Sequence, residues 1–408
     1  MKGSCVILQS GGPTAVINSS LYGVIKQAMI EEKITNVYGS LNGIEGLIND
    51  DLIDLNQEDE EQLELLKVTP SAVLGSSRFR LPKDYNDEVY AKIFETFKKH
   101  NIRYFFLIGG NDSMDTANKM ANYFANSSYW CKIMGVPKTV DNDLAITDHT
   151  PGYGSAAKFI ANVCAEIAID VECYRKGKVT IVEIMGRDAG WLTAASKLSC
   201  LTGHGVDLVY VPEVAFDVID FLNKTKEIYE RKKNAVIAVS EGIKDKDGNY
   251  ILSALGSETG SDAFGHMALG GVANALSLLV ASKLNLPTRS VELNLPQRCA
   301  SHLASLTDIN EAIECGKTAV KKAVSGLTGH MVIMNRVSTN PYVISYESKD
   351  LHEIANVVKY FPLEWVKNGC DIADEFIEYV RPLINGEPQY KFDKGVICFA
   401  NLKKIKVK

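Results

Sequence analysis

The chain has 408 residues, of which 46% are hydrophobic and 23% charged, a composition ordinary for a soluble globular protein of about two or three domains. Its formal net charge of −6 argues against a general nucleic-acid binder, because such proteins need a concentrated positive surface. The one basic cluster, at Lys403, Lys404, Lys406 and Lys408, is expected to be a solvated tail.

Nine cysteines are scattered along the chain without a C-x-x-C pair. This spacing is typical of a reduced intracellular protein and indicates neither a disulfide framework nor a zinc site. No apolar run reaches the roughly 18 residues of a membrane-spanning helix, and we expect no signal peptide before the first strand-like segment. The composition therefore predicts a cytoplasmic protein with neither a nucleic-acid nor a membrane partner.

The first predicted element is a short apolar strand at Cys5 to Leu8, followed by a turn that contains Gly11 and Gly12 and by a helical pattern from Val16. A strand, a glycine turn and a helix start bring free backbone N–H groups and the positive end of a helix to one point, which suits a phosphate. The turn is neither a G-x-G-x-x-G nor a Walker A sequence, and a plain turn remains the alternative.

Two arginines follow the next apolar run, Val73 and Leu74, after a few small residues. The planar guanidinium fork fits phosphoryl oxygens, so Arg78 and Arg80 are suited to stabilising a transferring group. For Arg80 a surface salt bridge is an equally good interpretation.

A predicted helix near residues 84–100 precedes a strand at Tyr104 to Ile108, which ends in a second glycine loop with Gly110, Asn111 and Asp112. The order of strand, glycine loop and helix is the same as at the start of the chain, because another helix follows the polar residues. Asp112 is either a helix N-cap worth ~1 kcal/mol or an acidic group placed among phosphates.

The strand near residues 131–136 ends in the densest polar stretch of the chain, Lys138-Thr139-Val140-Asp141-Asn142-Asp143. Alone, it would be interpreted as a solvated turn. The β-α-β-α-β order changes that interpretation, since parallel strands joined by helices place their carboxyl ends at one edge of a sheet, where ligands bind.

A second set of elements begins with a helix after Gly154 and continues with strands near residues 179–184, 207–211 and 235–239. The first strand ends in Met185, Gly186 and Arg187, and the third ends at Glu241. An arginine and a glutamate there fit a phosphorylated, hydroxylated substrate, although Glu241 is as easily a helix-start acid. We also expect a helix near 265–283, helix over 301–325, a hairpin of 330–334 with 343–346, and a helix at 372–380.

These segments together resemble the phosphofructokinases of the bacterial-type superfamily. The matching motifs occur in the order of the family over roughly the first 330 residues: SGGPTAVIN, LGSSRF, GGNDS, PKTVDND, PGYGSAAK, EIMGRDAGW, SEG and PQR. The resemblance implies two Rossmann-like three-layer α/β/α lobes with mostly parallel sheets and an active site in the cleft between them. It implies a phosphoryl-donor lobe at 1–151 plus about 255–325, and a sugar-phosphate lobe at 152–254 plus about 326–408.

The resemblance also implies the reaction and its residues. Phosphoryl transfer to the C1 hydroxyl of fructose 6-phosphate, with Mg²⁺, would use Asp141 as general base and Arg78 to steady the transferred group. Asp143 belongs with the metal, together with Asn111, where the family has an aspartate. Donor binding matches Gly11, Gly12, Gly110 and Lys138; sugar-phosphate binding matches Thr139, Val140, Asp141, Met185, Gly186, Arg187, Glu241 and Arg298, with Lys178 and Arg289 supplied by a neighbouring subunit. A shared site implies a homodimer or homotetramer.

Asp112 and Lys138 indicate the phosphoryl donor, because ATP-using members typically have glycine at both positions and the pair resembles the pyrophosphate-dependent branch. A carboxylate at Asp112 would repel the α-phosphate of ATP by charge and by size. Lys138 supplies a cation for a leaving phosphate that lacks the rest of a nucleotide. We therefore expect inorganic pyrophosphate as donor.

Three departures from the family pattern keep alternatives open: Asn111, Leu295 in place of a histidine, and Lys178 in place of an arginine. Lysine keeps the charge but not the bidentate fork. The alternatives are an ATP-dependent phosphofructokinase, an enzyme that also accepts sedoheptulose 7-phosphate, and a catalytically silent regulatory subunit. A plain sugar-phosphate binding protein fits less well, because binding alone needs no carboxylate base facing a phosphate loop.

Overall fold

A computed structural model of the chain describes residues 2–255 and 270–408. The chain forms two compact units, each made of segments that are far apart in the sequence. Unit 1 comprises Met1–Ser155, Arg298–Val358 and Ile384–Lys408, and unit 2 comprises Ala156–Gln297 and Lys359–Leu383.

Within the described residues, unit 1 is built on a seven-stranded sheet in the order β11-β10-β5-β4-β1-β2-β3. The strands β2, β1, β4, β5 and β10 pair in parallel, and β3 and β11 run antiparallel at the two edges. The strands are β1 (Gly3–Gln9), β2 (Ile34–Ser40), β3 (Leu52–Asp54), β4 (Ile102–Gly109), β5 (Lys132–Pro137), β10 (His330–Thr339) and β11 (Tyr342–Asp350).

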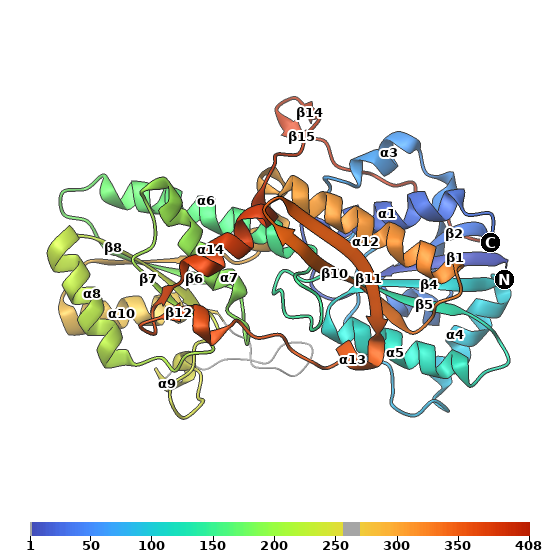
Figure 1. The fold of residues 1–408 in the computed structure, drawn as a ribbon, viewed down its shortest axis with the longest axis horizontal. Helices are drawn as coiled ribbons and strands as arrows, with labels where there is room; N and C mark the ends of the chain where they lie inside the picture. The colour runs from blue at the N-terminus through green and yellow to red at the C-terminus, as the bar shows by residue number, and fades with distance from the viewer. Residues whose placement is uncertain (1, 256–269) are drawn as a thin grey trace. The chain divides into compact units, whose positions relative to one another are not determined.

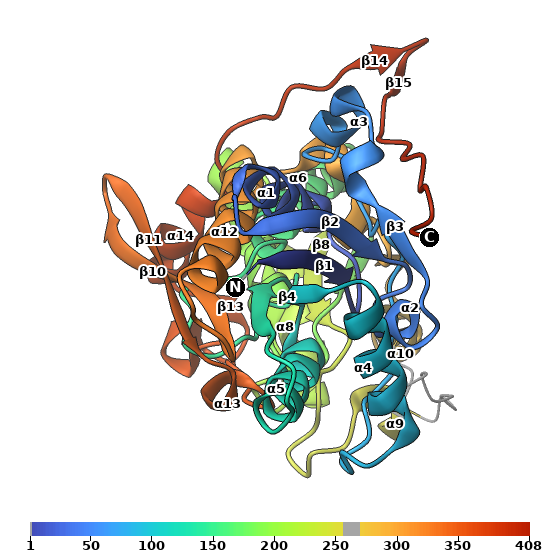
Figure 2. The ribbon, with the colours of Figure 1, turned by 90° about the vertical axis from the view of Figure 1, so that its right-hand side faces the viewer.

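Helices cover both faces of this sheet, with α1 and α12 on one side and α4 and α5 on the other (Figures 1 and 2). Successive side chains of a strand point to opposite faces. Accordingly Cys5 and Ile7 join the core under α1 and α12, whereas Val6 and Leu8 join the core under α4 and α5. The helices of unit 1 are α1 (Ile17–Ile30), α2 (Ile44–Ile48), α3 (Glu60–Leu65), α4 (Glu88–Lys99), α5 (Asn111–Ala125), α11 (Pro296–Cys299, shared with unit 2), α12 (Leu306–Val324) and α13 (Leu351–Ile354), with short 3-10 turns at Leu55–Gln57 and Ser301–Leu303.

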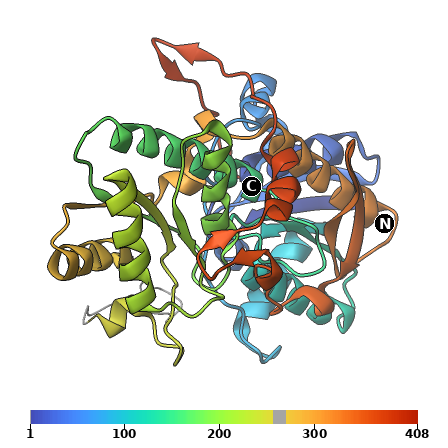
Figure 3. The ribbon, with the colours of Figure 1, turned by 60° about the vertical axis from the view of Figure 1, so that its left-hand side comes forward.

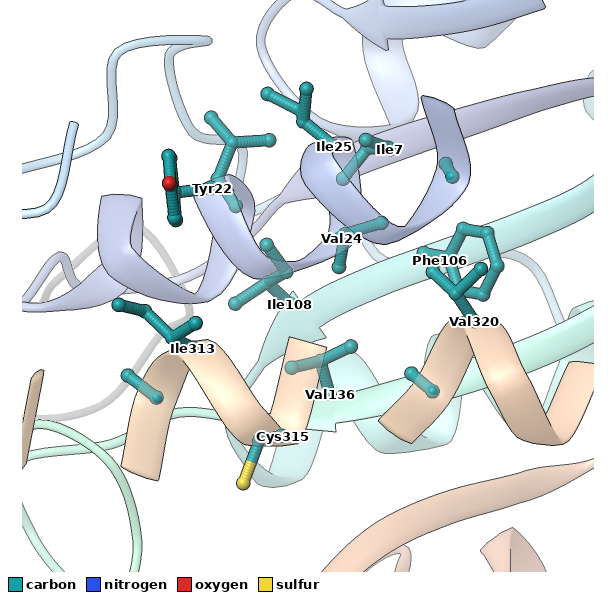
Figure 4. Close-up of a cluster of buried hydrophobic side chains, with 14 of the residues drawn as sticks. Ile7, Tyr22, Val24, Ile25, Phe106, Ile108, Val136, Ile313, Cys315 and Val320 are labelled. Atoms are coloured by element: carbon teal, nitrogen blue, oxygen red, sulfur yellow. The ribbon is translucent and has the colours of Figure 1, made fainter. Parts of the chain in front are cut away.

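α1 and α12 cross at very close range over the sheet (Figure 4). A Cβ atom on Gly23 would lie 2.1 Å from the carbonyl oxygen of Ile313, and one on Gly316 would lie 2.3 Å from that of Ser20. Only glycine fits at both positions, and Val24 and Val320 fill the core on either side of the crossing. The crossing fixes α12 against the sheet of unit 1, although the two helices are far apart in the sequence.

Unit 2 contains, in the described residues, a parallel four-stranded sheet in the order β7-β8-β6-β9. α8 and α10 pack on one face through a core that includes Ile181, Phe221 and Leu276, and α7 packs against β7 and β8. Figure 3 shows α8 in yellow-green and α10 in light orange. The elements are α6 (Tyr153–Glu172, begun in unit 1), β6 (Val179–Ile184), α7 (Trp191–Ala195), β7 (Leu208–Tyr210), α8 (Val218–Lys232), β8 (Ala235–Ser240), α9 (Ile251–Ala254), α10 (Val272–Leu284), β9 (Thr288–Glu292), β12 (Val366–Lys367), β13 (Asp371–Ile372) and α14 (Asp374–Val380), with 3-10 turns at Ser196–Thr202, Leu363–Trp365 and Arg381–Ile384.

The expected fold class is confirmed, since both units are α/β with mostly parallel sheets. The expected lobe bounds differ from the two units. The chain passes into unit 2 at residue 156, but residues 270–297 stay there because β9 pairs with β6. Residues 298–358 belong to unit 1 because β10 pairs with β5, and so do residues 384–408. The helix expected near 265–283 lies partly outside the described residues, and α10 begins at Val272.

The basic tail is solvated as expected at its four lysine side chains, which are all exposed, but its backbone is docked on unit 1. The tail follows the small hairpin of β14 (Phe392–Asp393) and β15 (Val396–Ile397), which projects from unit 1 in Figures 2 and 3. It then runs antiparallel along the edge strand β3, where Asp54 donates its backbone N–H to Ile405 at 2.8 Å. Lys403 pairs with Asp59 at 2.6 Å. The tail docks because an acidic stretch and an unpaired strand edge are both available to it.

Across residues 2–255 and 270–408, no helix has the combined length and apolar character that crossing a bilayer would require.

Candidate active site

The first glycine loop lies between β1 and α1 in unit 1. Gly11 has a φ of +76°, which favours glycine, and a Cβ atom there would lie 3.4 Å from the Nζ atom of Lys138. A Cβ atom on Gly12 would lie 3.2 Å from an Nη atom of Arg298. Two predicted site residues, Lys138 and Arg298, therefore bring their cationic groups to this loop.

Lys138 is almost completely buried, with 3% of its surface exposed, and its Nζ donates to the carbonyl oxygen of Gly12 at 2.7 Å. Burial lowers the pKa of Lys138, the Asp141 and Asp143 carboxylates partly oppose burial, and the Arg298 and Arg78 guanidinium groups add to it, so that the pKa is about 8. The structure thus brings these five predicted site residues into one electrostatic neighbourhood. A buried cation with one neutral partner is suited to receiving a negatively charged ligand.

The second glycine loop joins β4 to α5. Gly110 is the N-cap of this 15-residue helix, and the backbone N–H of Lys138 donates to the carbonyl oxygen of Gly109 at 3.1 Å. A Cβ atom on Gly110 would lie 3.4 Å from the backbone oxygen of Lys138. The positive end of α5 therefore faces the stretch that carries the predicted base, as phosphate binding requires.

Asp112 lies in the first turn of α5, and its carboxylate accepts from Arg80 at 3.4 Å. Both side chains are more than half exposed, at 56% and 55%. Arg80 therefore forms a surface salt bridge, as one of its two interpretations predicted. Its partner, Asp112, is the residue predicted to select the phosphoryl donor. An exposed pair of this length contributes little to stability.

Asn111, predicted to lie near the metal, is bound to the segment after α13. Its Oδ1 accepts from the backbone N–H of Asn356 at 2.6 Å, and its Nδ2 donates to the carbonyl oxygen of Val357 at 3.1 Å. The amide thus fastens this segment to the second glycine loop. Its carbonyl oxygen retains a second lone pair for another partner.

Asp141 is half-buried in the loop that follows β5, next to Val140, which is buried. Its backbone N–H donates to the hydroxyl oxygen of Thr139 at 3.1 Å, and that hydroxyl donates to the Asp141 carboxylate at 3.4 Å. Asn142 then takes a φ of +53°, the left-handed conformation that asparagine tolerates. This turn sets the directions of the Asp141 and Asp143 carboxylates.

In unit 2, the predicted sugar-phosphate residues gather at the carboxyl ends of β6 and β8. The backbone N–H of Gly186 donates to the Glu241 carboxylate at 3.3 Å, and burial raises the pKa of Glu241. The backbone N–H of Met185 donates to Gln297 at 3.0 Å. Met185 and Glu241 line a cavity of about 60 Å³, and Arg187 follows directly in the same loop.

Lys178 and Arg289 lie at the opposite end of this sheet. Lys178 precedes the first residue of β6, and Arg289 pairs in register with Thr180. Both line a separate cavity of about 190 Å³, and Arg289 also pairs with Asp170 at 3.1 Å. The structure therefore does not bring these two residues together with Gly186 and Glu241 within one chain.

Glu183 is a site residue that sequence reasoning missed. It lines the cavity of Met185 and Glu241, and it accepts the backbone N–H groups of Gly271 and Ala273 at the start of α10. Burial raises the pKa of Glu183. The sequence does contain a sign of this role, since Glu183 is the acidic residue of a strand that is otherwise apolar or β-branched. A buried acidic residue is unusual unless its charge has a fixed partner.

Glycine loops at the carboxyl ends of parallel strands, a buried lysine beside them and carboxylates in the next loop are typical of phosphoryl-transfer enzymes. Residues 4–291 match the family model described as Phosphofructokinase. The chain belongs to the phosphofructokinase family, and the predicted resemblance is confirmed.

Similarity extends along almost the whole chain. A pyrophosphate–fructose 6-phosphate 1-phosphotransferase of Halomonas elongata is 39% identical over 406 residues, which cover 98% of this chain and 96% of that protein. The protein of the same name from Methylococcus capsulatus is 38% identical with the same coverage. The crystal structure of the pyrophosphate-dependent phosphofructokinase from Nitrosospira multiformis superposes with a TM-score of 0.91 at 36% identity, covering 100% of this chain and 98% of that one.

Proposed function

We propose that the protein transfers a phosphoryl group from inorganic pyrophosphate to the C1 hydroxyl of fructose 6-phosphate. A bond forms between the hydroxyl oxygen and phosphorus, the bridging P–O bond of pyrophosphate breaks, and the products are fructose 1,6-bisphosphate and phosphate. The reaction runs near equilibrium and proceeds in both directions. The cytoplasmic location expected from composition stays a prediction.

The observation that carries this proposal is the buried ammonium group of Lys138, 2.7 Å from the carbonyl oxygen of Gly12. A phosphate that leaves from pyrophosphate carries its charge on a small group, which a fixed cation stabilises in the transition state. Full-length similarity to proteins named for pyrophosphate supports the same donor. The Asp112 carboxylate at the start of α5 would oppose the additional phosphate of ATP.

Asp141 acts as the general base, because a half-buried carboxylate held by Thr139 can accept the proton of the C1 hydroxyl as the phosphoryl group arrives. Arg78 steadies the transferred group. Met185, Gly186, Arg187 and Glu241 bind the sugar phosphate, with hydroxyls donating to the carboxylate. The retention of this whole set argues against a silent regulatory subunit.

Mg²⁺ fits the donor set of unit 1. The ion is commonly held by one or two carboxylates together with substrate phosphates and waters. Asp143 would hold it, and the Asn111 carbonyl oxygen would reach it through its second lone pair. Bound there, Mg²⁺ would neutralise charge on the phosphate oxygens. In the part of the chain that the structure describes, no three or more His, Cys, Asp or Glu side chains are grouped to hold a metal.

The position of Lys178 and Arg289 supports a homo-oligomer. Lys178 and Gly186 flank β6 and are eight positions apart, and at ~3.3 Å per residue this is about 26 Å, longer than a sugar phosphate. These two residues therefore serve the site of a second copy of the chain. The protein is a homodimer or homotetramer in which neighbouring subunits complete each other's sites.

A coupled assay with purified protein, fructose 6-phosphate and Mg²⁺ tests the donor. Pyrophosphate is expected to support turnover and ATP is not. Equal rates with the two donors would refute the assignment, and no turnover with either would favour the regulatory subunit.

A further inference from the structure

A cluster of buried and partly buried polar and charged side chains lies behind the active-site loop of unit 1. His149, whose side chain is 1% exposed, places Nδ1 2.7 Å from an Asp148 oxygen and Nε2 2.7 Å from a Glu311 oxygen. Arg336 donates to the same Asp148 oxygen at 2.9 Å, and the Tyr342 hydroxyl donates to the other Glu311 oxygen at 2.6 Å. We call these five residues the His149 cluster.

The geometry sets the charge of His149. Ionised carboxylates only accept hydrogen bonds, so an imidazole held between two of them must donate from both ring nitrogens and is an imidazolium. Two cations, His149 and Arg336, then balance two anions, Asp148 and Glu311. A buried ion network is tolerated when its charges balance and each has hydrogen-bond partners, and both conditions are met here.

The cluster draws on several elements. Glu311 comes from α12, Arg336 from β10 and Tyr342 from β11, whereas Asp148 and His149 belong to the loop between β5 and α6. The same loop pairs with β10, since Asp148 donates its backbone N–H to Met334 at 2.8 Å. The cluster therefore fastens the far half of the loop to the rigid frame of unit 1.

The far half of the loop in turn holds the half that carries the predicted base. The hydroxyl of Thr150 donates to the carbonyl oxygen of Thr139 at 2.8 Å, and Thr139 donates its N–H to Pro151 at 3.2 Å. Thr139 is the residue whose hydroxyl contacts Asp141. Two hydrogen-bonded steps thus connect His149 to the base.

Asp308, one helical turn before Glu311, anchors the end of the same loop. Its carboxylate accepts from the backbone N–H groups of Gly152 and Ser155 at 2.9 and 2.8 Å, and from the Ser155 hydroxyl at 2.6 Å. The first two turns of α12 therefore present two buried carboxylates to the loop. Asp308 holds the loop through backbone N–H groups, and Glu311 holds it through the side chain of His149.

We propose that His149 is a positioning residue for phosphoryl transfer: as an imidazolium between Asp148 and Glu311, it holds the loop of residues 139–152 so that Asp141 faces the acceptor hydroxyl. The inference rests on the proposed role of Asp141 as base. His149 itself touches no substrate.

The charge of His149 persists over a wide pH range. Burial alone would lower its pKa, but Glu311 and Asp148 outweigh burial and raise the pKa to about 9. The charged or titratable groups around His149 come from four segments of unit 1. They are Asp148 from the loop, Glu311 and Asp308 from α12, Arg336 from β10 and Tyr342 from β11.

The test compares His149→Gln with His100→Gln. A glutamine can donate to only one of the two carboxylates, so the loop loses one anchor. We expect kcat to fall about tenfold or more while KM for fructose 6-phosphate changes less than about threefold, because misplacing a reacting group lowers the chemical step more than binding. Hydrogen–deuterium exchange should become faster in peptides spanning residues 139–152.

His100 is the matched control, a buried histidine in the same unit, 2.6 Å from Asp50 and remote from the loop. His100→Gln should lose thermal stability and keep kcat within about twofold, as expected for a pair that acts on stability alone. The proposal is overturned if His149→Gln behaves in the same way, with kcat and exchange of the loop unchanged.

Glu311→Gln keeps the inference testable if His149→Gln does not fold. The amide carbonyl introduced by this substitution could still accept from His149, but the imidazolium loses one anion and its pKa falls. The alkaline limb of the kcat profile should therefore move to lower pH, and an unchanged profile would refute the proposal. Each kinetic constant of a variant is compared with that of the wild type, with whichever phosphoryl donor the wild type accepts. Turnover with ATP would thus refute the proposed donor and leave this inference standing.

Discussion

Lys138 and His149 are both buried cations in unit 1, yet their surroundings push their pKa values in opposite directions. The one hydrogen-bond acceptor of the Lys138 ammonium group is a neutral carbonyl, and burial lowers its pKa to about 8 despite the nearby Asp141 and Asp143. His149 lies between two carboxylates, and its pKa rises to about 9. A buried cation without a carboxylate in hydrogen-bond contact is suited to binding an anionic ligand. A buried cation that is hydrogen-bonded to carboxylates is suited to stabilising the fold.

Replacing Lys138 by glycine removes the cation that the donor phosphate would meet. We expect kcat/KM for pyrophosphate to fall about a hundredfold or more, the size usual for loss of one group that stabilises transition-state charge. Lys119→Met is the control, since Lys119 is paired with Asp115 on α5 at 2.7 Å. Steady-state kinetics with both variants measure the effect, and a Lys138→Gly enzyme as active as the control would contradict the proposed role.

The pKa of Lys138 also predicts the pH dependence of donor use. Lys138 carries its charge below about pH 8 and loses it above that pH in the free protein. The kcat/KM for pyrophosphate should therefore decline as the pH rises through this value, because kcat/KM reports groups of the free enzyme. A profile measured from pH 6 to pH 10 that stays flat would show that this charge is not needed.

His149 makes a separate prediction for stability. Its folded pKa of about 9 lies above the unfolded value of 6.5, so its contribution is complete below about pH 6.5 and is lost as the pH rises towards 9. Thermal unfolding of the wild type and of His149→Gln at several pH values measures the difference. The advantage of the wild type should shrink over this window, and a constant difference would contradict a charged His149.

At the scale of elements, the loops that end parallel strands were predictable because local sequence determines them. Glycine and charge follow an apolar run at Gly11, Gly110 and Lys138, and the structure gathers these residues at one edge of unit 1. The partners of His149 were not predictable in this way. Glu311 is separated from it by 162 positions, and no local pattern reveals which helix will lie behind a loop.

The predicted lobe bounds differ from the two units for a related reason. β9 and β10 are consecutive strands, and their sequences do not reveal that one joins β6 in unit 2 and the other β5 in unit 1. The docked tail was likewise interpreted from charge alone, whereas backbone pairing with β3 determines its position.

Deleting residues 405–408 should expose the edge of β3. Two backbone hydrogen bonds are lost, from Asp54 to Ile405 and from Val407 to Leu52, for a cost of about 2 kcal/mol. Denaturant unfolding of the truncated and full-length proteins measures this cost. Lys408→Ala is a control that changes tail charge without removing backbone pairs, and equal stability of truncated and full-length protein would show that the docked tail contributes nothing.

At the scale of the whole molecule, the proposed sharing of sites between subunits predicts complementation. Asp141→Asn and Arg289→Ala should each be inactive alone, and dissociation and re-association of an equal mixture should restore about a quarter of the wild-type activity. Half of random dimers are mixed, and each mixed dimer has one intact site. Activity assays after mixing measure the recovery. If each chain forms its own complete site, the mixture should recover nothing.

The two units are made of five chain segments, three in unit 1 and two in unit 2, so the polypeptide passes between them four times. During synthesis the first 155 residues leave the ribosome with the strands β1 to β5, but β10, β11 and the covering helix α12 emerge only after the next 142 residues of unit 2 (156 to 297). Unit 1 therefore remains incomplete while much of unit 2 is made, with α1 alone on the sheet face that α12 later shares. Neither unit can be produced as one uninterrupted fragment, and a nonsense codon at any position from 359 to 384 would leave unit 1 without residues 384–408.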